Sequence, residues 1–314
     1  MKTYGLFTLF ILALLCSCES EIKGDGRLTR VKTLNYYPSG SALEFINGRL
    51  YLMGDDARYV LVLNDDLEGV DSLVLFPGTG ARVPKEIKAD LESVSSYGFG
   101  QEDAFVLTGS GSLAPYRENV WWITNDLQQI DSMRDDAIYA RIRTLGVQDI
   151  NFEGTTEMNS KWLMGNRGNT THPKNYLIIL EPPFNRTPDS LDIHVAEVDL
   201  IPDTSFAGLS GLDYSKENDR LYLTFSIEKT NSSTGDGEIG KSFLCIIEDM
   251  STKLTAGTLA LDRIVDLQAI DSRFVGHKVE SVTIMSEDDE IAELALVSDK
   301  DDGKSTLFLL DLKL

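Results

Sequence analysis

Short apolar runs alternate with polar turns along this chain, and one pattern of this kind recurs five times. Each copy has a short strand-like run with a Glu or Ser near its start, followed by a second run that ends in a cluster of polar residues. The copies begin at Ser41, Ala89, Asn151, Leu209 and Val279. Short apolar runs separated by Gly, Asn and Asp are typical of strands joined by tight turns. The pattern therefore predicts an all-β chain.

The repeat also predicts how the strands are arranged. A unit of this size cannot bury both faces of its own sheet, so the copies must pack around a common axis and share a core. We predict a single β-propeller domain over 28–314 with five blades. A sixth, degenerate blade within 134–150 or 249–277 would also fit the spacing, and the pattern of 134–143 fits a short helix equally well.

The predicted strands leave one position in the ring open. The innermost strands are expected at 42–46, 91–97, 152–157, 211–214 and 279–285, and the outer strand of the fourth blade at 257–261. The fifth blade is one strand short where the sequence ends, whereas the strand-like segment 28–35 has no blade of its own. We therefore predict that this N-terminal strand completes the last blade and closes the ring.

The N-terminus has the features of an export signal. It has a basic start at Lys2, an apolar run over 6–15 and the sequence Leu-Cys-Ser immediately before Cys18. The apolar run is too short for a membrane-spanning helix. The residues before Cys18 resemble the lipobox of bacterial lipoproteins, whose Cys is lipidated and becomes the mature N-terminus, with plain secretion as the alternative. We predict a signal peptide over 1–17, a lipid anchor at Cys18 and a flexible tether over 18–27.

Composition narrows the classes of partner and site. The formal net charge is −21, which repels nucleic acid and anionic lipid headgroups. An acidic surface is compatible with cationic partners or divalent metals, and it also simply keeps an exported protein soluble. After removal of the signal and lipidation of Cys18, Cys245 is the one remaining free cysteine, so no intramolecular disulfide is available. Its Leu and Ile neighbours favour a core residue over a catalytic thiol.

The innermost strands of a propeller line its axis, so equivalent positions converge there. We expect the carboxylates of Glu44, Glu92, Glu153 and Glu280 to meet near the axis together with Ser210. Like charges at close range raise one another's pKa unless a cation or protons neutralise them. A bound Ca²⁺, which prefers oxygen ligands, is one solution. The alternative is that these side chains accept hydrogen bonds from backbone N–H groups of neighbouring blades without any metal.

A second set of polar residues follows the second strands and is expected at the same end of the ring. We predict a ligand-binding face made by Asp55, Asp56, Ser110, Arg167, Asn169, Glu228 and Asp299. Lys85, with Arg82 and Lys88, is a basic cluster in an otherwise acidic chain and is placed over the same opening or in solvent. The Arg167 guanidinium suits a carboxylate or phosphate. Turn formation alone would also select many of these residue types.

Two well-known kinds of site are not indicated. The three histidines, His172, His194 and His277, lack the spacing of zinc ligands. The segment Gly109-Ser-Gly-Ser112 is not a nucleophile elbow, which argues against a serine hydrolase.

Several short motifs resemble known propeller families. The segments Asn151-Phe-Glu-Gly154, Asn166-Arg-Gly-Asn169 and Gly109-Ser-Gly-Ser112, with Asp55-Asp56, are similar to those of an uncharacterised family of bacterial propeller lipoproteins. More distantly, Leu209-Ser-Gly-Leu-Asp-Tyr214 and Phe152-Glu-Gly154 resemble motifs of the phytase-like esterase propellers. The second resemblance implies metal and phosphate binding by acids that line the blades.

Our interpretation is an exported, lipid-anchored propeller of the cell envelope that binds a ligand or partner at its axial face. As an outer-membrane lipoprotein it would contact the membrane through its N-terminal lipid only. One alternative is a Ca²⁺-dependent phosphoesterase, with the four glutamates holding metal and Arg167 or Lys85 orienting the phosphate. A third interpretation is a structural scaffold in an envelope complex.

Overall fold

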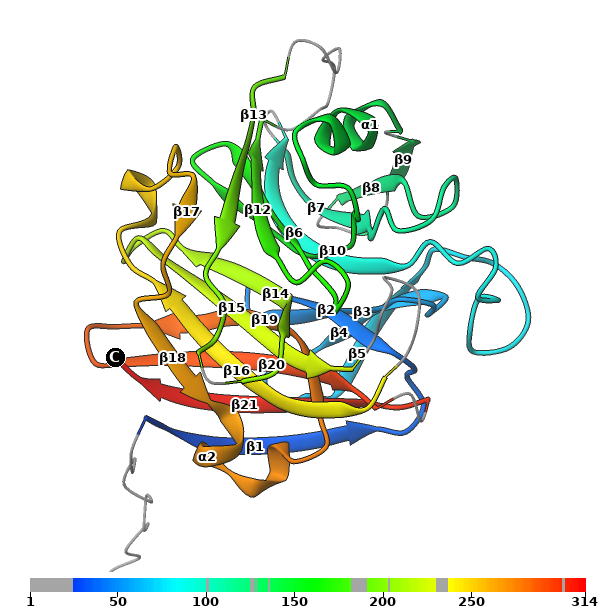
Figure 1. Ribbon diagram of the computed structural model, residues 1–314. Coiled ribbons are helices and arrows are strands. Elements are labelled where there is room, and N and C mark those ends of the chain that lie inside the picture. The colour runs from blue at the N-terminus through cyan, green and yellow to red at the C-terminus, as the bar shows by residue number, and fades with distance from the viewer. Residues whose placement is uncertain are drawn as a thin grey trace, which may run out of the picture.

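The fold was analysed in a computed structural model, which describes residues 25–99, 102–124, 127, 129–134, 136–181, 191–202, 204–229, 237–300 and 303–314. The predicted signal peptide, Cys18 and most of the predicted tether lie outside the described residues. Within them, the chain forms five antiparallel sheets arranged around an axis, as Figure 1 shows. The protein is therefore a five-bladed β-propeller, as predicted.

Each blade has four antiparallel strands, which follow one another from the axis outward. Blade 1 contains β2 (Gly40–Ile46), β3 (Arg49–Gly54), β4 (Tyr59–Leu63) and β5 (Gly69–Val74). Blade 2 contains β6 (Leu91–Phe99), β7 (Glu102–Gly109), β8 (Asn119–Thr124) and β9 (Ile130–Arg134). Blade 3 contains β10 (Phe152–Met158), β11 (Lys161–Asn166), β12 (Asn175–Leu180) and β13 (Ile193–Val198). Blade 4 contains β14 (Ala207–Ser215), β15 (Arg220–Glu228), β16 (Ile239–Ile247) and β18 (Arg263–Asp266).

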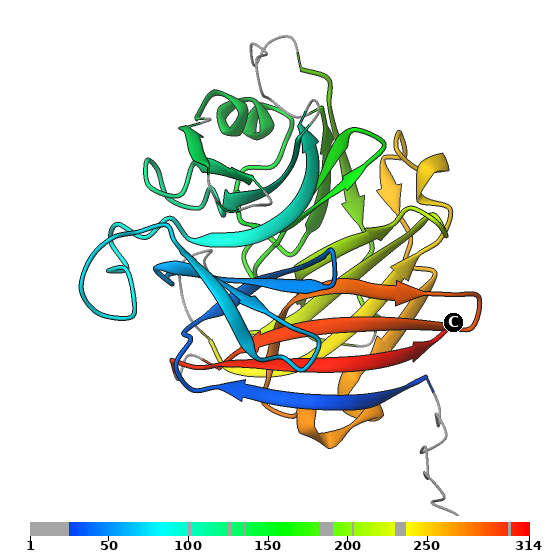
Figure 2. The same cartoon turned by 180° about the vertical axis from the view of Figure 1, so that it is seen from behind.

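Blade 5 is assembled from the two ends of the described chain. Its strands are β19 (Lys278–Glu287), β20 (Ile291–Asp299), β21 (Ser305–Lys313) and, outermost, β1 (Gly26–Leu34). β1 pairs antiparallel with β21 from Gly26 opposite Leu312 to Leu34 opposite Ser305. Figure 2 shows β1 in blue beside the red C-terminal strand. This confirms the predicted closure, which ties the first strand of the ring to the last and covers the edge of β21.

Two expectations about the outer elements are corrected. The segment 257–261 is not the outer strand of blade 4, because β17 (Thr258–Leu259) runs parallel to β13 and extends blade 3 instead. The outer position of blade 4 is taken by β18. In the part of the chain that the structure describes, neither 134–150 nor 249–277 forms a sixth blade.

Those two segments contain the short helices. The first holds α1 (Asp136–Thr144), and the second holds η2 (Met250–Thr252), α2 (Leu267–Ile270) and η3 (Ser272–Phe274). α1 has the short helical pattern considered for 134–143, and it buries Ile138, Tyr139 and Ile142. No helix of the described residues is long and apolar enough to cross a membrane.

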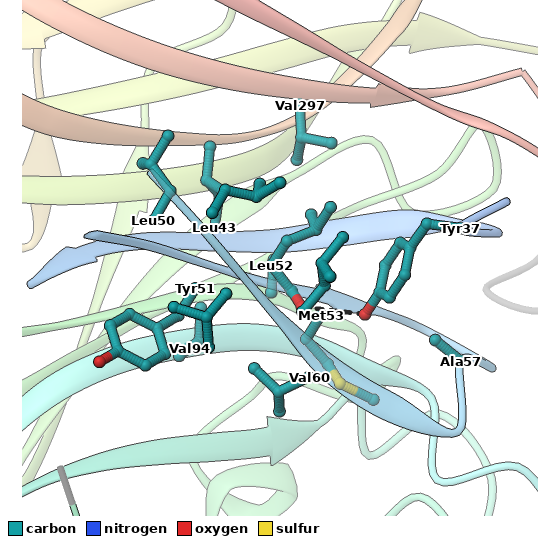
Figure 3. Close-up of a cluster of buried hydrophobic side chains, with 14 of the residues drawn as sticks. Tyr37, Leu43, Leu50, Tyr51, Leu52, Met53, Ala57, Val60, Val94 and Val297 are labelled. Carbon is teal, nitrogen blue, oxygen red and sulfur yellow. Dashed lines mark hydrogen bonds between the residues drawn. The ribbon is translucent and has the colours of Figure 1, made fainter. Parts of the chain in front are cut away.

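Apolar side chains between neighbouring blades form the core. Figure 3 shows Val297 of β20 and Val94 of β6, from the two neighbouring blades, packed against Leu43 and Leu52 of blade 1. Tyr37 precedes β2 and is fully buried there, and its hydroxyl donates to the Leu52 carbonyl at 2.9 Å. Lone Cys245 is also buried, and burial raises the pKa of its thiol. This burial favours the predicted packing role for Cys245.

The closure can be tested through the end of β1 that enters this core. Leu34 is 1% exposed and belongs to the same apolar cluster as Val297 and Leu307 of blade 5. We expect Leu34→Ala to lower the free energy of unfolding by about 2–4 kcal/mol, because a buried Leu leaves a cavity. Arg30→Ala on the same strand removes a solvent-exposed ion pair with Asp66 and an exposed hydrogen bond to the Asp65 carbonyl, and should change stability little. Urea unfolding would measure both, and equal stability of the two variants would contradict the account.

Candidate functional site: the axial charge cluster

The five innermost strands share one irregularity near their starts. Each has a register shift against its second strand that leaves one residue out of the pairing. The residues left out are Ser41, Glu92, Glu153, Ser210 and Glu280. A bulge of this kind redirects a side chain. We call the end of the ring where these bulges lie the charged face.

The bulges correct one predicted equivalence. Glu44 was aligned with Glu92, Glu153 and Glu280, but the bulge of β2 falls on Ser41, so Ser41 is the equivalent residue. Glu44 lies three residues further along β2, toward the opposite end of the axis. The sequence could not reveal this shift, because a Glu at the start of the apolar pattern occurs in either register.

Neighbouring inner strands approach closely beside the bulges. A Cβ atom on Gly154, which follows Glu153, would lie 2.9 Å from the backbone nitrogen of Leu212 on the next blade. A Cβ atom on Gly211, which follows Ser210, would lie 2.7 Å from the Cα atom of Ser281. Glycine at these positions therefore lets the backbones of blades 3, 4 and 5 meet near the axis.

Charged side chains from all five blades gather at the charged face. We define the axial charge cluster as six carboxylates and four basic groups, namely Asp55, Asp90, Glu92, Glu153, Glu228 and Glu280 with Lys88, Arg117, Arg167 and Lys278. If every group is ionised, the cluster carries two negative charges more than positive ones. The following contacts show how far its members neutralise one another.

Blades 1 and 2 meet through Lys88. Its ammonium contacts the Asp55 carboxylate and lies 2.6 Å from Oδ1 of Asp90. Asp90 also receives Nη1 of Arg117 at 2.6 Å and the Ser110 hydroxyl at 2.5 Å. Burial alone would raise the pKa of Asp90, but the charges of Lys88 and Arg117 outweigh it and hold that pKa below its usual value. Asp90 is therefore the ionised centre of this half of the cluster.

Blades 3, 4 and 5 meet through Arg167 and Lys278. Arg167 Nη2 donates to Glu228 at 2.9 Å, and its Nη1 lies 3.6 Å from Glu153. Lys278 Nζ lies 3.1 Å from Glu228 and 2.9 Å from Glu280. Burial would raise the pKa of Glu228, yet Lys278 and Arg167 together hold it below the usual value. Glu228 is thus the ionised centre of the second half.

The remaining carboxyl groups are poorly neutralised. Burial raises the pKa of Glu92 well above its usual value, and the neighbouring charges of Asp90 and Glu153 raise it further. Burial likewise raises the pKa of Glu280 to about 8, although Lys278 opposes the shift. The pKa of Glu153 is also raised by burial, against the effect of Arg167. Glu92, Glu153 and Glu280 are therefore the carboxyl groups of the cluster that favour the protonated form, which lowers the excess of negative charge.

Four polar atoms of the cluster are buried without a hydrogen-bond partner among the described residues. They are Oδ1 of Asp55, Nε of Arg117, Nη1 of Arg167 and Oε2 of Glu280. Such groups cost free energy unless water, an ion or a ligand satisfies them. The cluster thus has unused donor and acceptor capacity as well as an excess of negative charge.

Part of the cluster has the spacing of a metal site. Oxygen atoms of Asp55, Asp90 and Glu92 all lie within 4.8 Å of one another. However, the Lys88 ammonium contacts two of these three carboxylates, where it supplies the positive charge that a metal would supply. Hard carboxylate ligands suit Ca²⁺, so the donor set fits this ion in chemistry, in competition with Lys88.

An open cavity of about 360 Å³ lies at the charged face beside blade 1. It is lined by four of the predicted ligand-binding residues, Asp55, Asp56, Lys85 and Asp299, together with Arg82 and Lys88. Arg82 Nε donates to Asp56 at 2.5 Å. The structure therefore brings the predicted basic cluster and the acids after β3 and β20 to one opening.

The other predicted ligand-binding residues lie elsewhere on this face. Arg167 and Glu228 pair within the axial charge cluster, and Ser110 is fully buried against Asp90. The side-chain oxygen of Asn169 accepts the backbone N–H groups of Thr171 and His172, which is the geometry of a turn-forming residue. Ser110 and Asn169 thus shape the loops around the opening.

Sequence reasoning missed Asp90, Arg117 and Lys278 and left Lys88 without a defined role. A signal for three of them exists, because charged residues precede the bulge at alternate positions in Lys88-Ala-Asp90-Leu-Glu92 and in Lys278-Val-Glu280. Alternate residues of an extended chain lie on one face, so the sequence pattern alone would have predicted that these charges gather together. Arg117 lies in the loop between β7 and β8, where no local pattern marks it.

The fold and this site define the protein as a five-bladed propeller with a buried charge cluster at one end of its axis. Residues 36–312 match the sequence profile of a family of unknown function, DUF6929, and the chain belongs to that family. A sequence search of curated proteins finds no match.

Solved structures with a similar fold include enzymes and proteins without an assigned function. A glutaminyl cyclase from Myxococcus xanthus superimposes with a TM-score of 0.52 at 12% identity, covering 92% of this chain and 97% of that one. A GH43 β-1,3-galactosidase gives 0.47 at 10% identity, covering 87% and 90%. A DUF4221 member from Bacteroides vulgatus gives 0.42 at 8% identity, covering 92% and 99%. At these identities the glutaminyl cyclase likeness shows the propeller fold alone.

The raised pKa of Glu280 predicts a pH dependence of stability. Between pH 4.5 and about 8 the native state keeps a proton that unfolded Glu280 loses, so rising pH lowers the free energy of unfolding. Glu280→Gln removes this titration and should become more stable than wild type as pH rises, by up to about 1.4 kcal/mol per pH unit. Urea unfolding at pH 5, 6, 7 and 8 measures the difference. Parallel pH profiles would contradict the assignment.

Lys88 should be more important for folding than an ordinary lysine. We expect Lys88→Met to lower the free energy of unfolding by about 3–5 kcal/mol, because Asp55 and Asp90 are left buried beside an apolar side chain. Lys241→Met, which removes the half-exposed pair with Asp266, serves as the matched control and should change stability little. Thermal unfolding of both proteins tests this, and equal melting temperatures would be inconsistent with a buried network.

Proposed function

We propose that the protein is an exported, lipid-anchored propeller that binds a cationic ligand, or a partner with a cationic group, at its charged face. The observation that carries this proposal is the charge imbalance of the axial charge cluster, in which four buried and two half-buried carboxylates face four basic groups. A ligand that brings positive charge would favour the ionised forms of Glu92 and Glu280, because ionised carboxylates attract a cation that their protonated forms do not.

Ca²⁺ is the simplest ligand of this class. One divalent ion would balance the two excess charges of the cluster, and carboxylate oxygens are the ligands it prefers. The unpaired oxygens of Asp55 and Glu280 supply acceptors for it or for its bound water. A cationic group on an envelope protein would satisfy the same charges, which keeps partner binding within this proposal.

The Ca²⁺-dependent phosphoesterase is a weaker alternative. The trio of Asp55, Asp90 and Glu92 favours a metal beside the opening. A phosphate, however, needs available positive charge, and Arg82 and Lys88 already pair with Asp56, Asp55 and Asp90. A purely structural role in an envelope complex does not explain why the cluster has more acidic than basic groups.

The anchor and location in the cell envelope follow from the N-terminal sequence. A basic start, an apolar run and a lipobox-like sequence at Cys18 support export and lipidation. In this proposal the propeller is tethered to the outer membrane and the charged face is available to ligands in the periplasm or at the cell surface.

Calcium binding can be tested directly on the purified protein. We expect CaCl₂ titration to give heat of binding and to raise the melting temperature, because an ion that binds the native state stabilises it. The Glu92→Gln/Glu280→Gln double variant should lose both effects, since it lacks the two carboxyl groups that exchange protons for the ion. Glu290→Gln, which changes an exposed carboxylate in the turn before β20, is the matched control and should bind as wild type does.

Two outcomes would count against the metal. Absence of both heat and thermal shift in wild type would exclude a functional Ca²⁺ site at the charged face. Equal binding by the double variant would place the ion elsewhere. A partner capture experiment with wild type against the double variant would then test the remaining form of the proposal.

A further inference from the structure

A second cavity lies at the opposite end of the propeller axis. It has a volume of about 340 Å³ and surrounds the points where β2, β14 and β19 end, three strands that lie together at the centre of Figure 1. We call it the hairpin mouth. Its lining includes Glu44, Phe45, Asp213, Tyr214 and Met285. It shares no residue with the cavity at the charged face.

Glu44 and Asp213 occupy equivalent positions, three residues beyond the bulges of β2 and β14. The five residues at this position are Glu44, Ser95, Thr156, Asp213 and Thr283, and all carry a side-chain oxygen. At four of the five junctions this oxygen accepts a backbone N–H group from the next inner strand: Ser96 to Glu44 at 2.9 Å, Tyr214 to Thr156 at 3.3 Å, Ile284 to Asp213 at 2.9 Å and Phe45 to Thr283 at 3.0 Å.

These hydrogen bonds connect neighbouring blades, but the accepting side chain does not need to be charged. Thr156 and Thr283 make the same contact with a neutral hydroxyl. Asp213 also accepts the Thr156 and Thr283 hydroxyls, whereas Glu44 brings a carboxyl group to a position where a hydroxyl makes the same backbone contact in blades 3 and 5. Since burying charge costs free energy, the acidity of Glu44 calls for another explanation.

No basic side chain of the described residues forms an ion pair with Glu44 or Asp213. Both are more than nine-tenths buried, at 7% and 8% exposure. Burial raises the pKa of Glu44 well above its usual value, and the charge of Asp213 raises it further. This differs from the charged face, where Lys88, Arg167 and Lys278 lie among the acids. The hairpin mouth therefore has a buried acidic floor without an internal cation.

The other charged groups at the mouth do not change this balance. Glu287 accepts from Arg220 Nη1 at 2.8 Å, so its charge is neutralised within the fold. Lys216 and Glu217 are both exposed at the rim and have opposite charges. Glu44 and Asp213 are therefore the acidic groups of the mouth that no basic side chain of the described residues neutralises.

Hydrogen-bonding capacity distinguishes the two carboxyl groups. Asp213 Oδ1 accepts from the Thr156 hydroxyl at 3.1 Å and its own neighbour Tyr214 N–H at 2.8 Å. Its Oδ2 accepts from the Thr283 hydroxyl at 3.1 Å and from Ile284 N–H at 2.9 Å. These four bonds fill its acceptor sites. Glu44 Oε1 accepts the Ser96 N–H group at 2.9 Å, and the Ser96 hydroxyl also hydrogen-bonds to the Glu44 carboxyl group. Glu44 thus uses about two of its four acceptor sites, and it lines the cavity.

This arrangement favours an organic cation over a metal ion. Ca²⁺ needs about six to eight oxygen ligands, and Asp213 has no acceptor site left to contribute. Half-buried Phe45, Tyr214 and Met285 offer aromatic and thioether surface, which suits a cation carried on an apolar stem. We propose that the hairpin mouth binds a primary ammonium or guanidinium group, whose N–H donates to the Glu44 carboxylate while Asp213 supplies the second negative charge. This inference concerns a different face from the proposed function and stands independently of it.

Calorimetric titration of the purified full chain provides the test. The probes are 1,4-diaminobutane, agmatine, N-acetyl-lysine amide, uncharged 1,4-butanediol and CaCl₂. We expect the amine and guanidinium probes to bind and butanediol not to bind, with binding unaffected by saturating CaCl₂. Tighter binding of diaminobutane or agmatine would indicate a small free amine as ligand. Tighter binding of the blocked lysine would indicate the side chain of a polypeptide.

Substitution of Glu44 locates the binding. Glu44→Gln retains an amide oxygen for the Ser96 N–H group but removes the charge, and it should weaken binding by at least about tenfold. Glu290→Gln is the exposed control and should bind normally. Asp213→Thr copies the residue found at the equivalent position of blades 3 and 5, so it gives a second test if Glu44→Gln does not fold. No heat with any cationic probe, equal binding of butanediol, or unchanged affinity of a folded charge-removed variant would overturn the proposal.

Discussion

Closure of the ring by the pairing of β1 with β21 is the constraint on which the rest of the structure depends. It fixes five sheets around one axis and forces the five innermost strands to approach one another. Glycine at 154 and 211 permits that approach, and the bulges beside them turn polar side chains toward the shared space. The chemistry of the axis is thus a consequence of closure, because residues far apart in sequence have no other reason to meet.

Buried carboxyl groups are stabilised in different ways at the two ends of the axis. At the charged face, Lys88, Arg117, Arg167 and Lys278 lie between carboxylates, so most charges are matched within the protein. At the hairpin mouth, hydrogen bonds from backbone and threonine groups stabilise Asp213, and Glu44 has no basic neighbour among the described residues. Internal cations favour a rigid network, whereas an acidic floor without them favours uptake of a cation from outside.

Much of the fold could be predicted from the sequence, since the period of apolar runs and the unpaired segment before Ser41 were enough for five blades and for closure by the N-terminal strand. The outer strands were less predictable. Residues 257–261 have a strand-like pattern, but their partner is β13 of another blade, which only tertiary packing decides. The same limit applies to the axis. Glu92, Glu153 and Glu280 were correctly aligned, whereas Glu44 was misplaced because bulge positions depend on backbone geometry that no residue type specifies.

The presence of a charged candidate site could be predicted from the sequence, but the extent to which its charges neutralise one another could not. Acidic residues at strand ends indicated a charged axial face, yet the neutralising partners come from loops and from residues before the inner strands. Arg117 contacts Asp90 from a loop that no local pattern marks, whereas Lys278 contacts Glu280 two residues further along β19. Their presence changes the interpretation of the acidic ring from carboxylates that a Ca²⁺ ion would neutralise to a network that lacks two positive charges.

The central claim is that this network holds protons on Glu92 and Glu280 when no cation is bound. Infrared spectroscopy of the native protein at pH 6 measures it most directly, through the carbonyl band of protonated carboxyl groups. The account predicts that this band is present in wild type and is weaker by about two carboxyl groups in the Glu92→Gln/Glu280→Gln variant, since the cluster has two negative charges in excess. An identical band in the two proteins, or its absence from wild type, would contradict it.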